Sequence, residues 1–71
     1  MNSKYDHYSM VIQWEPIDQI YVATVPELPG CMTHGKTYEE AVSQCQDAIV
    51  TWIDGSEELG LPVPQPRMLV A

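Results

Sequence analysis

One stretch of the chain has the spacing of an amphipathic helix. Between Tyr38 and Ile53, apolar residues recur three or four positions apart and fall on one stripe. We expect two of them, Ala48 and Trp52, to be buried against a sheet. The full stripe consists of Tyr38, Ala41, Val42, Cys45, Ala48, Ile49, Trp52 and Ile53.

Residues at both ends of this stretch predict where the helix begins and ends. Thr37 is expected to be the N-cap, and Glu40 is expected to reach back to the backbone N–H of Thr37, as in a capping box. Gly55 weakens the far end, but Leu59 returns near the apolar face. We therefore expect the helix to continue to Leu59, with Gly60 as its C-terminal glycine.

The segments before the helix read as strands. Residues 8–14 alternate between their two faces, as a half-buried strand does, and residues 20–25 are rich in β-branched residues and Tyr. Residues 15–19 between them are turn-forming. Prolines break the pattern at residues 26–30, and residues 31–34 form a short third strand that ends at Gly35. After the helix, the proline-rich residues 61–67 must be extended, and residues 68–70 predict a last short strand.

The expected order is therefore β-β-β-α-β. It predicts an α+β fold in which one long helix packs on a three- to four-stranded, mainly antiparallel sheet. We expect residues 1–71 to form a single domain whose polar residues 1–7 are disordered. A domain of this size buries only roughly 60% of the surface of its unfolded chain. Oligomerisation would compensate for so small a core.

Charge narrows the choice of partners. Ten acidic and three basic residues give a formal net charge of −7. Nucleic acids and anionic membranes require clustered Lys and Arg, so neither is an expected partner, and a basic protein is. The alternative is that the charge only keeps the protein soluble. Cys45 falls on the helix stripe as a core residue, and the first residues lack a secretory signal, so we expect a cytoplasmic location.

Candidate chemistry is sparse. Cys31 and His34 form Cys-x-x-His, which is half of a zinc motif, and a nucleophilic pair of these two would need an orienting third group. Glu39 and Glu40 are explained by the helix start, and Asp47 lies on the polar helix face. We expect no catalytic residue, metal site or cofactor. A metal-dependent nuclease or a hydrolase that uses Cys31 is the weaker alternative.

Three motifs together resemble a known family. They are Pro-Glu-Leu-Pro-Gly-Cys at residues 26–31, Gly-x-Thr-x-Glu-Glu-Ala at residues 35–41, and Gly-x-Pro-x-Pro-x-Pro at residues 60–66. Over about residues 8–66, the chain resembles the small N-terminal domain of HicB antitoxins. The resemblance implies a partial ribonuclease-H-like fold without that fold's catalytic carboxylates. It also implies a bacterial toxin–antitoxin system and a homo-oligomer, either a dimer or a tetramer.

In this family, the domain binds and neutralises a small basic HicA-type toxin, which is an mRNA-cleaving ribonuclease. Many HicB proteins continue into a DNA-binding domain. This chain ends at Ala71 with three Lys and Arg residues, so direct DNA binding is not expected. The alternative function is that of a solitary homo-oligomeric structural or regulatory protein that has no toxin partner.

The expected partner-binding residues lie outside the core. Glu27, Leu28 and Pro29 belong to a stiff loop that we expect to face solvent, and stiff loops lose little entropy on binding. His34 and Tyr38, on either side of the helix start, complete the set. Depending on the register of the strands, the sheet face opposite the helix should carry some of Val11, Ile20 and Val22, and residues 68–70 could pair with another subunit.

Overall fold

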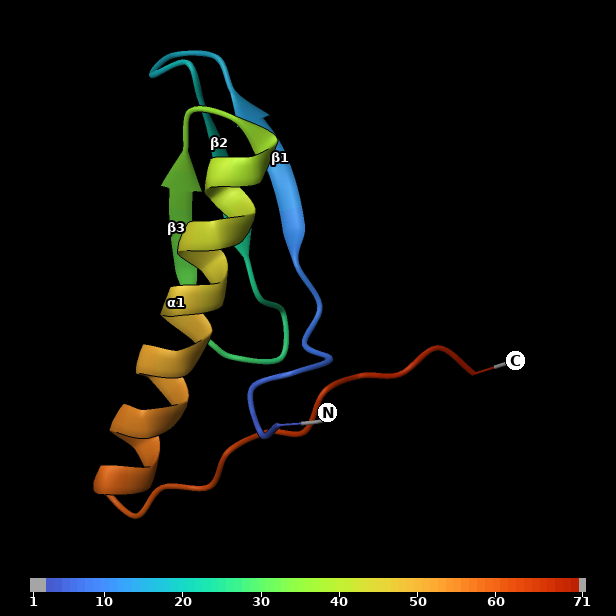
Figure 1. Cartoon of the computed structure of the whole chain (residues 1–71), viewed down its shortest axis with the longest axis vertical. Coiled ribbons are helices and arrows are strands. Elements are labelled where there is room, and N and C mark those ends of the chain that lie inside the picture. The colour runs from blue at the N-terminus through green and yellow to red at the C-terminus, as the bar shows by residue number, and fades with distance from the viewer. Residues whose placement is uncertain (1–2, 71) are drawn as a thin grey trace.

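The computed structural model describes residues 3–70, which form an antiparallel sheet and one long helix in the order β-β-β-α (Figure 1). The α+β fold predicted from the sequence is thereby confirmed. The elements are β1 (Val11–Glu15), β2 (Ile20–Thr24), β3 (Met32–Gly35) and α1 (Tyr38–Glu58).

The three strands lie in sheet order β1-β2-β3, and both neighbouring pairs are antiparallel. Across the sheet, Ile12 lies opposite Ala23, which in turn lies opposite Thr33. Ala23 is fully buried, so this row faces the helix. α1 packs mainly on β3 and β2, and β1 lies at the edge that the helix covers least (Figure 1).

The core lies between the sheet and the helix. α1 contributes residues four apart, which is the spacing of a single helical face. Cys45 belongs to this face, as the sequence predicted, and burial raises the pKa of its thiol and of the buried Cys31 thiol. The buried hydrophobic residues are Ala23, Val25, Leu28, Cys31, Ala41, Cys45, Ile49 and Ile53.

Ala48 and Trp52 are half-buried and pack at the margin of this core. The indole N–H of Trp52 donates a hydrogen bond to the carbonyl oxygen of Pro29, at 2.9 Å. Trp52 is therefore fixed to the loop between β2 and β3, in addition to its apolar contacts with the core.

The helix starts at the predicted cap, with one difference. The Thr37 hydroxyl accepts a hydrogen bond from the Glu40 N–H at 3.0 Å. The Glu40 carboxylate accepts a hydrogen bond from the N–H of Lys36 at 3.2 Å. The prediction that its donor is the Thr37 N–H is therefore wrong, because the donor is the amide one residue earlier. Thr37 has an extended backbone, with φ −129° and ψ 166°, and the amide before it is the one that reaches the carboxylate.

The end of the helix matches the prediction. α1 runs through Gly55 to Glu58, and Leu59 is its C-cap. Gly60 follows with a φ of +70°, a left-handed conformation that favours glycine. The Gly60 N–H donates to the Glu57 carbonyl at 3.1 Å, and the Leu61 N–H donates to the Ser56 carbonyl at 2.9 Å. This pair of bonds is a Schellman motif, which satisfies carbonyls at the helix end.

The N-terminal segment differs from the expected disorder over residues 1–7. Residues 1 and 2 lie outside the described part, but residues 3–7 form a turn against the last turns of α1. The Lys4 ammonium contacts the Glu57 carboxylate at 2.6 Å, and the Tyr5 hydroxyl donates to Asp54 at 2.6 Å. Lys4 thus supplies a positive charge at a helix end whose own last turn has none.

The prediction of a last strand at residues 68–70 is wrong within the part of the chain described. Residues 61–67 are extended as expected, and the Tyr8 hydroxyl donates to the Pro64 carbonyl. Beyond Arg67 the chain leaves the body of the molecule, and Met68, Leu69 and Val70 are exposed (Figure 1). The sheet of residues 3–70 has three strands in the order β1-β2-β3, and residues 68–70 pair with none of them.

Candidate protein-binding surfaces

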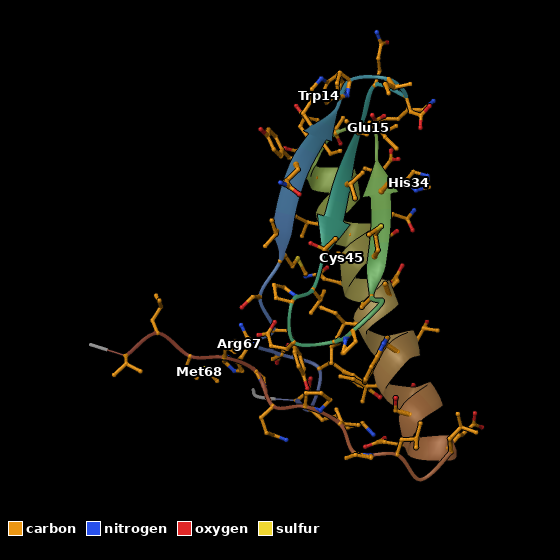
Figure 2. The ribbon with its side chains drawn as sticks, turned by 180° about the vertical axis from the view of Figure 1, so that it is seen from behind. Trp14, Glu15, His34, Cys45, Arg67 and Met68 are labelled. Atoms are coloured by element: carbon orange, nitrogen blue, oxygen red, sulfur yellow. The ribbon has the colours of Figure 1, made fainter. Side chains whose placement is uncertain are left out.

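The outer sheet face, opposite the helix, is the broadest candidate surface, and Figure 2 views the molecule from this side. One cross-strand row joins Val11, Thr24 and Met32, and the next joins Gln13, Val22 and His34. Alternation along the strands makes these rows the ones that point away from α1. We define the outer sheet face as Val11, Gln13, Ile20, Val22, Thr24, Met32 and His34.

Four apolar side chains lie on this face, along its length from the β1–β2 turn to the opposite end of the sheet. Val11 and Met32 are exposed, and Ile20 and Val22 are half-buried. The predicted position of Val11, Ile20 and Val22 opposite the helix is confirmed. A contiguous apolar surface rimmed by polar side chains is typical of protein-binding sites.

Three aromatic side chains gather where β1, β2 and the helix start meet, and we call them the aromatic end. The Trp14 and Tyr21 rings lie edge to face with centroids 5.0 Å apart, and the Tyr21 and Tyr38 centroids are 4.2 Å apart. Burial and a hydrogen bond with Tyr38 raise the pKa of Tyr21, and the nearby Glu39 charge acts in the same direction. Trp14 and Tyr38 are exposed, so their faces are available to a partner.

The sequence pattern pointed to Tyr38 but missed the two rings beside it. Trp14 and Tyr21 are directly opposite one another in the β1–β2 ladder. The alternation along the two strands already placed Trp14 and Tyr21 on helix-facing positions of neighbouring strands. That pattern could have predicted that the two rings lie side by side.

The loop of residues 26–30 does not face solvent as expected. Glu27 has 6% of its surface exposed, and Leu28 is fully buried in the core. The loop folds inward through backbone bonds: the Leu28 N–H donates to the Val25 carbonyl at 3.1 Å, and the Cys31 N–H donates to the Leu28 carbonyl at 3.0 Å. Pro29 is exposed. The expectation was therefore wrong for Glu27 and Leu28, because this tight turn directs their side chains inward.

Glu27 joins three segments of the chain. Its carboxylate accepts bonds from the Ser9 N–H at 3.0 Å, the Ser9 hydroxyl at 3.0 Å and the Arg67 N–H at 2.9 Å. Burial acts to raise the pKa of Glu27, but the bonds from the Arg67 and Ser9 amides outweigh it and the pKa is lowered. We call Glu27, Ser9 and Arg67 the Glu27 clasp. Sequence reasoning missed it, since a carboxylate between prolines is typical of exposed loops.

The five predicted partner-binding residues are therefore not brought into one site. Glu27 and Leu28 point inward, and Pro29 holds Trp52 through its carbonyl. His34 lies on the outer sheet face, and Tyr38 belongs to the aromatic end. Their role in binding a partner stays a prediction.

The side chains considered for catalysis do not converge. Cys31 is buried in the core, and His34 is exposed on the outer sheet face (Figure 2). Within residues 3–70, no three His, Cys, Asp or Glu side chains lie close enough together to hold a metal ion. In the same part of the chain, no helix combines the length and apolar composition of a bilayer-spanning segment.

Comparison with known proteins places this fold and these motifs in a family. A family model described as a HicB-like antitoxin of bacterial toxin–antitoxin systems matches residues 8–71. A UPF0150 protein of Thermoplasma acidophilum is 36% identical over 58 residues, which cover 82% of this chain and 83% of the relative. A UPF0150 protein of Synechocystis is 33% identical over 64 residues, which cover 90% of this chain and 80% of the relative.

A shorter match is to an uncharacterised 14.9 kDa protein from the rep-hol intergenic region of Haemophilus phage HP1. It is 39% identical over 44 residues, which cover 62% of this chain and 33% of the phage protein. The family match extends over β1, β2, β3, α1 and the tail, and includes the loop, the capped helix start and the alternating prolines. The chain therefore belongs to the HicB-like antitoxin family.

Proposed function

We propose that this protein is an antitoxin that binds and neutralises a small, basic, mRNA-cleaving toxin of the HicA type. The observation that carries the proposal is the family match over residues 8–71. The net charge of −7 supports it, because opposite charges accelerate encounter with a basic protein and favour the complex. An mRNA-cleaving toxin acts in the cytoplasm, and we place the antitoxin there.

Neutralisation in this proposal is an act of binding and requires no chemistry by the antitoxin. The outer sheet face offers Met32 and His34, and the aromatic end offers Trp14 and Tyr38. Large exposed aromatic and Met side chains are the types enriched at protein interfaces. Glu27 and Leu28 contribute indirectly, by fixing the loop that carries Pro29.

The test is co-expression with a HicA-like toxin, taken from the neighbouring gene if that gene encodes a basic protein of similar size. We expect growth to be restored and the two proteins to elute together on gel filtration. A toxin that stays fully active, with no complex formed, would overturn the proposal.

Surface variants then locate the contact. Tyr38→Ala and Met32→Ala should each weaken the complex by about tenfold if these side chains are buried in it. Ile17→Ala is the matched control, because Ile17 is equally apolar and is exposed in the turn between β1 and β2. If all three variants bind the toxin with equal affinity, the toxin contacts neither of these surfaces.

The second candidate is a homo-oligomer, a dimer or a tetramer, that has no toxin partner. The exposed apolar residues Met68, Leu69 and Val70 favour self-association. A chain that assembles alone, and has no basic protein encoded beside it, would support this candidate over the first.

A further inference from the structure

The flank of α1 nearest to residues 3–10 carries apolar side chains that the sheet does not cover, because α1 packs mainly on β3 and β2. Val50, on this flank, is 37% exposed although it lies one residue from the buried Ile49. A hollow of about 430 Å³ lies here, between α1 and the segment that precedes β1; its lining is Ser3, Tyr5, Asp6, His7, Tyr8, Met10, Gln46, Ile49 and Val50. A second hollow, of about 330 Å³, lies along the same helix and is lined by Tyr38, Glu39, Val42, Ser43 and Gln46. We call this region, lined by Met10, Val42, Gln46, Ile49 and Val50, the β1 groove.

The strand beside this groove has an open edge. Within residues 3–70, β1 pairs with β2 alone, so its outer edge presents backbone N–H and C=O groups without a ladder partner. Such an edge readily accepts another strand. A strand added to β1 would also lie over the groove, because neighbouring strands are only about 4.8 Å apart.

The tail has the properties of the missing strand. The Glu27 clasp fixes Arg67 beside Ser9, two residues before β1 begins. Beyond it, Met68 is exposed, Val70 is 94% exposed and Leu69 is completely exposed. Prolines alternate up to Pro66 and then stop, so each amide from Met68 to Val70 is a potential ladder donor, whereas the Arg67 amide is already bonded to Glu27. Three consecutive apolar residues in water favour burial against another surface.

The tail does not turn back along its own β1. In both views it leaves the molecule on the β1 side, and Met68 projects away from the strands (Figures 1 and 2). A second copy of the chain offers the same open edge and the same groove, and its own tail in return. An exchange of this kind is reciprocal and closes as a two-fold dimer.

We propose that residues 68–70 of one copy add as a strand to the outer edge of β1 of a second copy and cover its β1 groove, and that the second tail does the same in return. The inference rests on the self-association considered above as the second candidate function. It is tested without the toxin, because the oligomeric state of the chain alone is measured.

The test is sedimentation equilibrium of the full chain over a range of concentrations. We expect the unmodified protein to dimerise, and Leu69→Asp to raise the dissociation constant at least tenfold. Ile17→Asp is the matched control: Ile17 is 88% exposed, in the turn between β1 and β2, and its substitution should leave the dimer unchanged. Both side chains are exposed, so the circular dichroism of either variant should match that of the parent.

Hydrogen exchange locates the contact. The amides of residues 8–15 should exchange more slowly as concentration rises in the unmodified protein, and should show no such change in Leu69→Asp. A dimer that Leu69→Asp does not weaken would overturn the strand exchange and leave self-association standing. A chain that stays monomeric at every concentration would overturn both, and neither result would bear on the toxin.

Discussion

Glu27 lies almost wholly out of solvent, in a loop whose prolines favour exposure. A buried carboxylate is tolerated only when donors surround it, and here the donors come from Ser9 and Arg67, which are far apart in sequence. Leu28, the next residue, is fully buried. At this scale, a motif that identifies the family serves to hold the chain ends to the core.

Replacing this carboxylate tests its contribution. Glu27→Gln preserves the size of the side chain but removes its charge. The new side-chain NH2 group is itself a donor, so it cannot accept the bonds from Ser9 and Arg67. We expect the free energy of unfolding to fall by about 2 kcal/mol. Urea denaturation measures it, with Glu58→Gln as control, because Glu58 is exposed and its replacement should cost nothing. Equal losses in the two variants would contradict a stabilising role for the clasp.

The lowered pKa of Glu27 also predicts a pH dependence. Burial opposes the charge, but the Arg67 and Ser9 amides stabilise it more, so the unfolded chain binds the proton first as pH falls. The stabilisation is complete above the ordinary pKa of 4.5 and is lost as pH falls through the lower folded value. The difference in unfolding free energy between the parent and Glu27→Gln should therefore shrink below about pH 4.5. A constant difference down to about pH 3 would contradict this.

Glycines set the limits of α1 at the scale of the element. Gly35 is buried where β3 leads to the helix, and an added Cβ would overlap the backbone nitrogen of Ala41. Gly60 has a left-handed φ that closes the Schellman motif. Gly55, within the helix, has open space around it and no such requirement.

Gly55 and Gly60 should therefore respond in opposite directions when they are replaced by alanine. Gly55→Ala should stabilise the protein by up to about 1 kcal/mol, because alanine loses less backbone entropy in a helix. Gly60→Ala should destabilise it by roughly 1 kcal/mol, because its φ of +70° strains any residue that has a Cβ. Thermal unfolding measures both, and a loss of stability in Gly55→Ala would show that the helix is distorted at that position.

Element boundaries were predictable where the signal is local. The Thr37 cap, the passage of α1 through Gly55 and the Gly60 stop depend on residues within one or two helical turns. The Glu27 clasp and the Lys4 contact were not predictable, because they join residues 40 and 53 positions apart. The tail was predicted as a strand from its residue types alone, but a strand forms only where the chain also runs along an edge, and beyond Arg67 the tail leaves the body of the molecule.

At the scale of the whole molecule, the property that matters most for association is the net negative charge. A net charge of −7 on 71 residues makes copies repel one another and attract basic proteins. The two candidate associations therefore depend on salt in opposite directions, because salt screens both effects.

Raising the salt concentration from about 50 mM to about 500 mM should weaken the complex with a basic ribonuclease and strengthen the homodimer. Isothermal titration measures the first dissociation constant and sedimentation equilibrium measures the second. A toxin complex that tightens with salt would show that its contact is apolar and that the net charge contributes little.

The Glu27 clasp also has a mechanical consequence. Ser9 and Arg67 bond to the same carboxylate, so a force applied at these two residues is transmitted first to these few hydrogen bonds. The antiparallel ladders of β1, β2 and β3 and the packing of α1 lie between the two anchor points and carry load only after the bonds break. A pulled molecule should lengthen in two stages, releasing the tail from the body before the sheet and helix separate.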